Sequence, residues 1–330
     1  TIEPNIGNVI VPDFRLNKLA EMANSKKIIP TQMQFVDIAG LVSGASKGEG
    51  LGNQFLAHIR EVDAIIHVLR CFDNPDITHV NNQVNPQHDA EIIETELILA
   101  DISSLEKQIT NLKKKIRGND PDLKKLNDLM ERLFNHLSSG KKAFDFKAKT
   151  IEDQMNINEL NLLTSKPQLY VCNVSEEDIV SGNEYSEKIQ KQNNSTENKV
   201  ILISSLIESE ISILNNEDKI VFLQDLKLKE TGLTKLINSG YDLLDLITFF
   251  TVGEKEARAW TLKKGLTAPK AAGKIHTDFE KGFIRAETIG YQDFIDSEGE
   301  QGAKDLGKLR IEGSDYIVND GDIFNFRFNV

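Results

Sequence analysis

Four short apolar runs, separated by longer polar or helix-forming segments, constrain the fold of this chain more than any other feature. They are residues 33–40 (MQFVDIAG), 64–72 (AIIHVLRCF), 168–174 (QLYVCNV) and 199–205 (KVILISS). Apolar runs of this length, bounded by turn-forming residues, predict buried strands. Buried strands that alternate with helices predict a parallel sheet. We therefore expect an α/β fold whose ligands bind at the carboxyl ends of the strands.

A heptad pattern interrupts this series between the second and third runs. Its apolar positions alternate in spacings of four and three: Ile98, Ile102, Leu105, Ile109, Leu112 and Ile116, then Leu126, Met130, Leu133 and Leu137. The turn-forming sequence GNDPD at 118–122 separates the two halves. The pattern predicts an antiparallel coiled-coil hairpin that projects from the sheet. Two solvated helices packed on the sheet are the alternative.

The pattern changes again near residue 247. TFFTVGEKEARAWTL contains two β-rich runs joined by a turn, and APKAAGKIHTDFEKGF predicts a helix. RAETIGY and the terminal DGDIFNFRFNV predict further strands. We expect a small α+β domain at the C-terminal end.

Charge is distributed unevenly along the 330 residues. The formal net charge of −12 disfavours a protein that coats nucleic acid with its whole surface. Residues 101–150 nevertheless hold twelve basic and seven acidic residues, and Lys113, Lys114 and Lys115 lie at the predicted tip of the hairpin. This basic arm is a candidate contact for RNA.

Two absences narrow the class of protein. No run approaches 18 apolar residues, so no membrane-spanning helix is expected. The two cysteines, Cys71 and Cys172, each lie inside an apolar run. They predict buried thiols in a reducing compartment and argue against a disulfide framework or a zinc site.

Asp37 and Gly40 form a D-x-x-G sequence at the end of the first predicted strand. In phosphate-transfer sites such an Asp holds Mg²⁺, and the Gly offers its backbone N–H to the terminal phosphate. The glycine-rich residues 48–52 (GEGLG) could instead indicate the dinucleotide site of an oxidoreductase. Their G-x-G-x-G spacing and their distance from the strand disfavour that interpretation.

Asn173, Val174 and Glu176 directly follow the third predicted strand. P-loop GTPases place N-K-x-D there, and its Asp reads guanine. Val174 replaces the Lys and the longer Glu176 replaces the Asp, which favours adenine read by backbone groups. A solvated acidic loop is the alternative. Ser204 and Ser205 follow the fourth strand, where such folds place a second loop that contacts the base.

Two histidines differ in their predicted roles. His67 lies inside an apolar strand and is expected to be a structural core residue. His79 lies just beyond a strand end and is a candidate for the catalytic site. No Ser/His/Asp arrangement, metal-spaced Cys/His cluster or paired-carboxylate signature is evident in the sequence.

Taken together, the sequence resembles the YchF / Obg-like ATPase family from Thr1 to Val330. The resemblance rests on the opening TIEPN, the 36-residue run that begins at DIAGLVSGASKGEGLGNQF, the NVSE tetrad and three C-terminal stretches, FFTVGEKEARAWT, APKAAGKIHTDFEKGFIRAE and YIVNDGDIFNFRFNV. It implies an Obg-type P-loop NTPase domain over 1–93 and 150–246, a coiled-coil insertion over 94–149, and a β-grasp (TGS) domain over 247–330.

The resemblance also implies an activity and partners. Family members hydrolyse ATP in preference to GTP with Mg²⁺ and associate with ribosomes. For this chain it implies a cytoplasmic, monomeric regulatory switch linked to translation and stress. It would contact the large subunit or the 70S ribosome, and RNA, through the hairpin tip and the TGS domain. A non-catalytic adaptor that binds RNA or ribosomes is the alternative function.

The resemblance assigns roles to individual residues. Thr1 and Asp37 would hold Mg²⁺, with Thr1 at the threonine of the first switch segment. Leu41 stands where Ras-like enzymes keep a water-orienting Gln, so another residue, for which the family suggests His79, must position the water. Asn173, Val174 and Glu176 fall at the altered base-specificity motif.

One departure from the family concerns the start of the chain. No G-x-x-x-x-G-K-[ST] sequence occurs in it, and it opens with Thr rather than Met. Family members carry that phosphate-binding loop upstream of TIEPN. Without that loop, hydrolysis and tight nucleotide binding would be lost. Because the chain does not open with Met, we expect it to be a truncated part of a longer protein.

Overall fold

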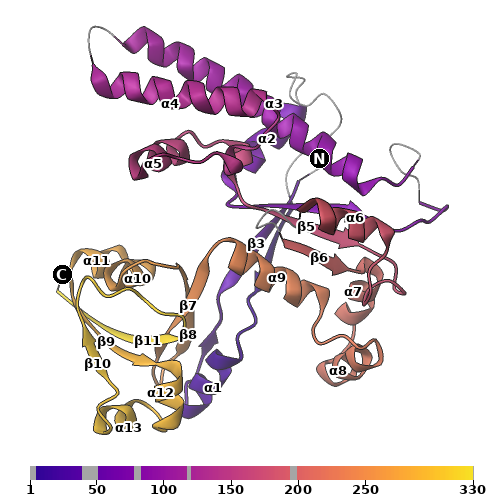
Figure 1. Cartoon of the computed structure of the whole chain (residues 1–330). Helices are drawn as coiled ribbons and strands as arrows, with labels where there is room; N and C mark the ends of the chain where they lie inside the picture. Colours follow the sequence, from indigo (N-terminus) through magenta and orange to yellow (C-terminus); the bar gives the residue numbers. More distant parts are fainter. Residues whose placement is uncertain (1–4, 39–50, 78–82, 117–119, 194–198, 330) are drawn as a thin grey trace. The chain divides into compact units, whose positions relative to one another are not determined.

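The computed structural model describes residues 5–38, 51–77, 83–116, 120–193 and 199–329 (Figure 1). The chain divides into two compact units. The first comprises Thr1–Ile6 and Val36–Leu236, and the second comprises Gly7–Phe35 and Ile237–Val330. The second unit therefore includes a segment from near the start of the chain, which the domain boundaries expected from the sequence placed with residues 1–93.

Three parallel strands form the sheet of the first unit, in the order β4 (Ile65–Arg70), β5 (Gln168–Asn173) and β6 (Lys199–Ile203). Leu69 of β4 is opposite Cys172 of β5, which is opposite Leu202 of β6. Every residue of β5 before Asn173 is buried, as expected for a parallel strand covered on both faces. The predicted α/β fold with a parallel sheet is confirmed.

The apolar run at 33–40 contains a strand, but that strand has a different partner. β3 (Gln32–Asp37) pairs with β1 (Asn5–Ile10) in a separate two-stranded sheet. Just after β3, Ile38 packs against Leu56 and Ile59 of α2 (Leu51–Glu61). The chain beyond Asp37 is thus anchored on a helix of the first unit.

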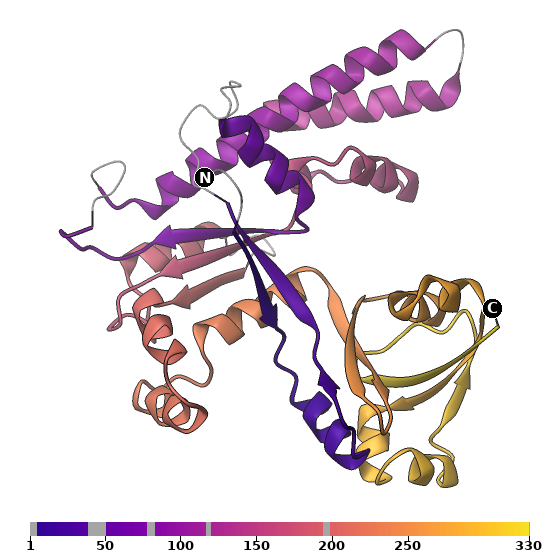
Figure 2. The same ribbon diagram turned by 180° about the vertical axis from the view of Figure 1, so that it is seen from behind.

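Two long helices, α3 (Pro86–Lys115) and α4 (Pro121–Ser138), form the predicted hairpin (Figures 1 and 2). The predicted heptad positions line its core, with Leu105, Leu133 and Leu137 fully buried. Ile116 differs, because it is the C-cap residue after the last turn of α3. Asn85 and Asp120 accept hydrogen bonds from the first turns of the two helices, so each helix begins at a side-chain cap.

α3 packs both against the sheet of the first unit and in the hairpin. It begins well before the expected hairpin boundary at residue 94, because its first turns cover the sheet. Ala90 packs with Leu69 and Tyr170, and Leu97 packs with Leu56. A single helix therefore connects the sheet with the hairpin.

Asp101 fixes the middle of α3 to the segment before β5. Its side chain is almost fully buried and accepts the backbone N–H groups of Leu163 and Thr164, each at 2.8 Å. The Thr164 hydroxyl donates a third bond to it at 2.7 Å. Burial raises the pKa of Asp101, and these three donors oppose that rise. Residues 163–165 form the short 3₁₀ turn η3 (Leu163–Ser165), and another, η2 (Ala143–Asp145), follows α4.

The other helices of the first unit follow the hairpin and the strands. They are α5 (Ile151–Glu159), α6 (Glu184–Asn193), α7 (Ser205–Ser212), α8 (Asn216–Asp225) and α9 (Gly232–Leu243), the last of which continues into the second unit. At the start of α9, Glu208 accepts the N–H groups of Gly232 and Leu233 at 2.6 and 3.1 Å. This bond joins α7 to the first turn of α9.

A mixed sheet of six strands forms the second unit. The strand order is β10 (Arg310–Glu312), β9 (Phe283–Gly290), β11 (Asp322–Phe328), β7 (Leu246–Val252), β8 (Ala257–Lys263) and β2 (Ile28–Ile29). β11 is parallel to β7 and β2 is parallel to β8, whereas the other pairs are antiparallel. The predicted small α+β domain is confirmed.

Helices α10 (Ala268–Ile275) and α11 (Thr277–Lys281) lie over one face of this sheet. Phe249, Phe324 and Phe326 point from the sheet into the core that α10 covers. The sequence predicted one helix here, and the structure has two, because His276 between them has an extended backbone and caps α11.

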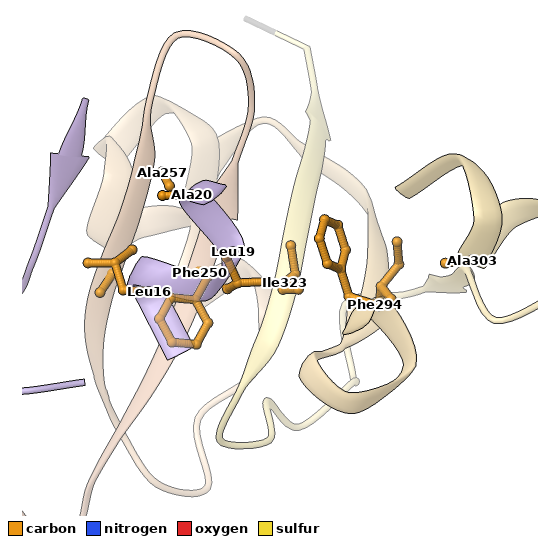
Figure 3. Close-up of a cluster of buried hydrophobic side chains, with 10 residues drawn as sticks. Leu16, Leu19, Ala20, Phe250, Ala257, Phe294, Ala303 and Ile323 are labelled. Carbon is orange, nitrogen blue, oxygen red and sulfur yellow. The ribbon is translucent and has the colours of Figure 1, made fainter. Parts of the chain in front are cut away.

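The opposite face of the sheet is covered by α1 (Phe14–Met22), α12 (Tyr291–Asp296) and α13 (Glu300–Asp305). Figure 3 shows Leu16, Leu19 and Ala20 of α1 packed against the strands that carry Phe250 and Ile323. Burial of one such leucine contributes about 1.5–3 kcal/mol. The early segment of the chain is therefore an integral part of the C-terminal core.

Two further expectations concern buried groups. Cys71 and Cys172 are free and buried, which confirms the predicted buried thiols. His67 is buried and stacked on Tyr170 with ring centroids 4.9 Å apart, which confirms it as a core residue. Burial lowers the pKa of His67 to about 4. Among the helices in the described ranges, none has the length and apolar character needed to cross a membrane.

Candidate functional site

The candidate site lies at the carboxyl ends of β5 and β6. Asn173 is the last residue of β5, and Ser204 and Ser205 directly follow β6. The Ser205 N–H donates to Asn173 Oδ1 at 3.0 Å, and the Val174 N–H donates to the Ile203 carbonyl at 2.9 Å. The structure therefore brings together four of the five predicted base-binding residues at one edge of the sheet, where α/β folds bind ligands.

Val174 differs from the expectation in one respect. Its side chain is 2% exposed and packs with Leu69 and Ile189, and its N–H is already bonded within the sheet. The residue that replaces the lysine of N-K-x-D thus faces the core. Glu176 and Ser205 are exposed at this edge and are the side chains available to a base.

The loop after Asn173 is held by a network that the sequence analysis missed. Asp178 accepts hydrogen bonds from Ser175 Oγ and Asn183 Nδ2, both at 2.8 Å. Asn183 Nδ2 also donates to the Cys71 carbonyl at 2.7 Å, and Asn183 Oδ1 accepts from the first turn of α6. An Asn before a helix is a recognisable cap, so Asn183 could have been found in the polar stretch 181–198.

The two thiols support this edge from within the sheet. Cys71 and Cys172 share a hydrogen bond, which, together with burial, raises the pKa of Cys71. The Cys71 N–H donates to the Asn173 carbonyl at 2.8 Å. The same contact lowers the pKa of Cys172. Both thiols are buried structural groups beside Asn173 and are not exposed nucleophiles.

Arg70 organises the chain between β4 and the predicted His79. Its guanidinium donates to the backbone carbonyls of Phe72, Asn74 and Ile77, at 3.1, 3.0 and 2.9 Å. One side chain thus fixes the path of the segment that leads to residue 78. The sequence analysis missed this role, because an Arg at a strand end has no spacing that distinguishes it.

The phosphate side of the site is described only in part. Asp37 is exposed at the end of β3 and makes no hydrogen bond or ion pair with other described residues. Thr1, Gly40 and His79 lie outside the described residues. Of the four residues predicted on the phosphate side, the structure describes Asp37 alone. It shows no contact between Asp37 and Asn173.

The donor chemistry fits Mg²⁺ held together with a nucleotide. Mg²⁺ usually takes one or two protein oxygen ligands, with phosphate and water as the others. Among the residues that the structure describes, the carboxylate of Asp37 has no partner, so it could serve in this way. Within the described ranges no cluster of three or more His, Cys, Asp or Glu side chains could hold a metal.

The predicted hairpin tip is only partly available for contact. Lys113 forms an ion pair with Glu131 of α4 at 2.8 Å, which ties the two helices together. Among described residues, Lys114 and Lys115 have no such partner, and both are exposed. Lys114 and Lys115 are thus exposed cations near this end of the hairpin, as are Lys124 and Lys125 in the first turns of α4.

Comparison with known proteins places this site in a family. Residues 18–118 match the family model described as a 50S ribosome-binding GTPase, and residues 246–329 match the YchF GTPase C-terminal model, described as a protein of unknown function. The chain is 51% identical to a Bacillus subtilis protein and 50% identical to an Escherichia coli O157:H7 protein, both called ribosome-binding ATPase YchF. Each match covers 100% of this chain and 90% of the relative. The chain belongs to the YchF family.

A solved structure supports membership of the YchF family at the level of the fold. The Schizosaccharomyces pombe YchF GTPase is 37% identical, with a TM-score of 0.88, over 99% of this chain and 88% of the other. The chain thus has the fold of a P-loop NTPase. Asn173 and Ser205 lie outside the segment that the GTPase model matches, and they are covered by the full-length YchF relatives.

Proposed function

We propose that this protein is a ribosome-binding ATPase that hydrolyses ATP in preference to GTP. The observation that carries the proposal is the 51% identity, over the whole chain, to a relative called a ribosome-binding ATPase. The hydrogen-bonded edge at Asn173 supports a nucleotide base site. We further propose that the protein acts as a cytoplasmic monomer and as a regulatory switch linked to translation and stress.

In the proposed reaction, water attacks the terminal phosphate of ATP in line with the departing ADP. The work of such a site is positioning and electrostatic stabilisation, since the protein forms no covalent bond. Asn173, Glu176 and Ser205 would hold the base, with the buried Val174 and Ser204 shaping the edge from the core. The Gly40 N–H would bind the terminal phosphate, and His79 would orient the water.

Thr1 and Asp37 would hold Mg²⁺ in this scheme. The ion would supply positive charge to the phosphate oxygens. Asp37 suits this role because its carboxylate has no partner among the described residues and is free to bind an ion.

The adenine preference predicts the behaviour of one conservative variant. Glu176→Asp shortens the exposed acid at the base edge and should leave the space that a guanine edge needs. We expect the ratio of the GTP to the ATP dissociation constant to fall about tenfold, which corresponds to about 1.4 kcal/mol. Equilibrium binding of both nucleotides to the full-length natural protein measures this ratio.

The neighbouring Glu177 supplies the matched control. It is also exposed, so Glu177→Asp makes the same chemical change one residue away and should leave the ratio unchanged. Tighter binding of GTP than of ATP by the unaltered protein would contradict the proposed preference.

The proposed ribosome contact includes RNA at the hairpin tip. Replacing Lys114 and Lys115 by Ala removes two exposed cations and should weaken co-sedimentation with ribosomes. The slope of log affinity against log salt should fall by about 1–2, because each phosphate contact contributes about 0.7–0.9. Lys107→Ala, on the same helix, is the control. An unchanged affinity and slope would remove the tip from the contact.

A non-catalytic adaptor is the second candidate, favoured by the basic tip. An adaptor would bind ribosomes without nucleotide turnover. Measurement of ATP hydrolysis by the full-length natural protein, with and without ribosomes, separates the two functions.

A further inference from the structure

Helix α8 is well formed although none of its residues is fully buried and Phe222 and Leu223 are only half-buried. Asn215 caps it, since Asn215 Oδ1 accepts the Asp218 N–H at 2.9 Å and Asn215 Nδ2 donates to the Asp218 carboxylate at 2.8 Å. Among described residues α8 makes no extensive contact with another helix or strand. Figures 1 and 2 both place it beyond α7, away from the three-stranded sheet. Helices of ten residues are marginal without a packed face, so the cap alone does not account for its apolar residues.

Three apolar residues in and just before α8 are exposed. Ile220 and Val221 of α8 are 58% and 56% exposed, and Ile213, at the end of α7, is 85% exposed. We name Ile213, Ile220 and Val221 the α8 surface. Aliphatic side chains that gather on an exposed element mark an interaction site, whereas a single exposed one does not.

The charge around the α8 surface selects the class of partner. Residues 205–230 contain six acidic residues and three lysines, two of which, Lys227 and Lys229, follow α8, so the region is net acidic. Glu217, Asp218 and Asp225 are exposed on α8 itself. Carboxylates at this density repel RNA phosphate and anionic lipid, and they attract cationic side chains. The combination of apolar and acidic groups fits a protein surface that is apolar and basic.

We propose that the α8 surface docks on a basic, apolar surface of a ribosomal protein component. This inference rests on the proposed ribosome binding and adds a protein contact to the RNA contact of the hairpin tip. The two contacts have opposite charge, so the molecule would meet RNA with one element of the first unit and protein with another.

The test compares two double variants on two targets. Ile220→Gln with Val221→Gln removes the apolar side chains and keeps good helix formers. Ile151→Gln with Met155→Gln makes the same kind of change on α5, where both side chains are also exposed. Dissociation constants of the full-length protein are measured for intact ribosomes and for ribosomal RNA extracted from the same ribosomes.

We expect the α8 variant to bind intact ribosomes about tenfold more weakly and extracted RNA as tightly as the unaltered protein, with the α5 variant unchanged on both. An unchanged affinity for ribosomes, or an equal loss on extracted RNA, would overturn the inference. Failure of the unaltered protein to bind ribosomes would instead refute the proposed function.

A second copy of the protein, or another segment of the same chain, could cover the α8 surface instead, and each would give a different result. If a second copy covers it, light scattering finds a dimer that the α8 variant dissociates. If the chain itself covers it, the α8 variant lowers the unfolding midpoint of the free protein and the α5 variant does not. Either result overturns the assignment to a ribosomal protein.

Discussion

Replacing Asp37 by Asn is expected to lower the rate of Mg²⁺-dependent ATP hydrolysis by about 100-fold or more. The side chain keeps its size and loses its charge, and the exposed carboxylate has no partner among the described residues whose loss could disturb the fold. The effect should therefore be confined to the ion. Steady-state hydrolysis by the full-length protein across a Mg²⁺ titration measures it.

The Mg²⁺ dependence distinguishes this role from a structural one. A weakened ion site shifts the titration to higher Mg²⁺, so part of the lost rate should return at high concentration. Asp76→Asn neutralises another exposed carboxylate of the first unit and is the control. Equal rates and equal Mg²⁺ dependence for the Asp37 variant and the unaltered protein would show that Asp37 does not hold the ion.

Replacing Leu19 by Ala is expected to destabilise the second unit by about 2–5 kcal/mol. Leu19 is fully buried between α1 and the sheet, so its loss leaves a cavity in the core of Figure 3. The only tryptophan of the chain, Trp260, lies on β8 of this unit. Its fluorescence during denaturant unfolding therefore reports the stability of the second unit.

Leu306 provides the matched control for Leu19. It belongs to the same unit and is 66% exposed, so Leu306→Ala removes the same atoms without opening a cavity. Its effect should stay within about 0.5 kcal/mol. A similar, small effect for both variants would show that α1 contributes little to the core despite its packing.

The strands of both units could be predicted from the sequence, because their signal is local. β5 is an apolar run buried on both faces, and β11 alternates between Ile323 on one face and Phe324 and Phe326 on the other. The hairpin was also predictable, since its seam repeats every seven residues and ends at a strong turn.

What the sequence did not predict is which segments meet. The pattern of α1 says that one face is buried, and it does not identify the sheet 230 residues later that covers this face. Likewise, the sequence of β3 predicts a strand but does not show that this strand pairs with β1. Hydrophobic periodicity specifies a buried face, whereas its partner follows only from the packing of the whole chain.

The candidate site also has features that could be predicted from the sequence and features that could not. The approach of Asn173 to Ser205 was predictable, because the carboxyl ends of adjacent parallel strands meet at one edge. The inward orientation of Val174 and the ion pair of Lys113 with Glu131 were not. The orientation of Val174 depends on the core cluster that it joins. The ion pair depends on the register between α3 and α4, which the spacing along one helix does not determine.

The packing of residues 7–35 into the C-terminal core changes what a domain deletion means for this protein. A chain cut after residue 246 would strip Phe250 and Ile323 from Leu16 and Leu19, and would leave an apolar stripe of α1 in water. Activity lost by such a cut would report misfolding and aggregation as much as the missing domain. Conversely, the C-terminal domain cannot be transplanted intact from one stretch of sequence. Its core is built from two separate segments of the chain. Any fusion or recombination that separates these segments disrupts that core.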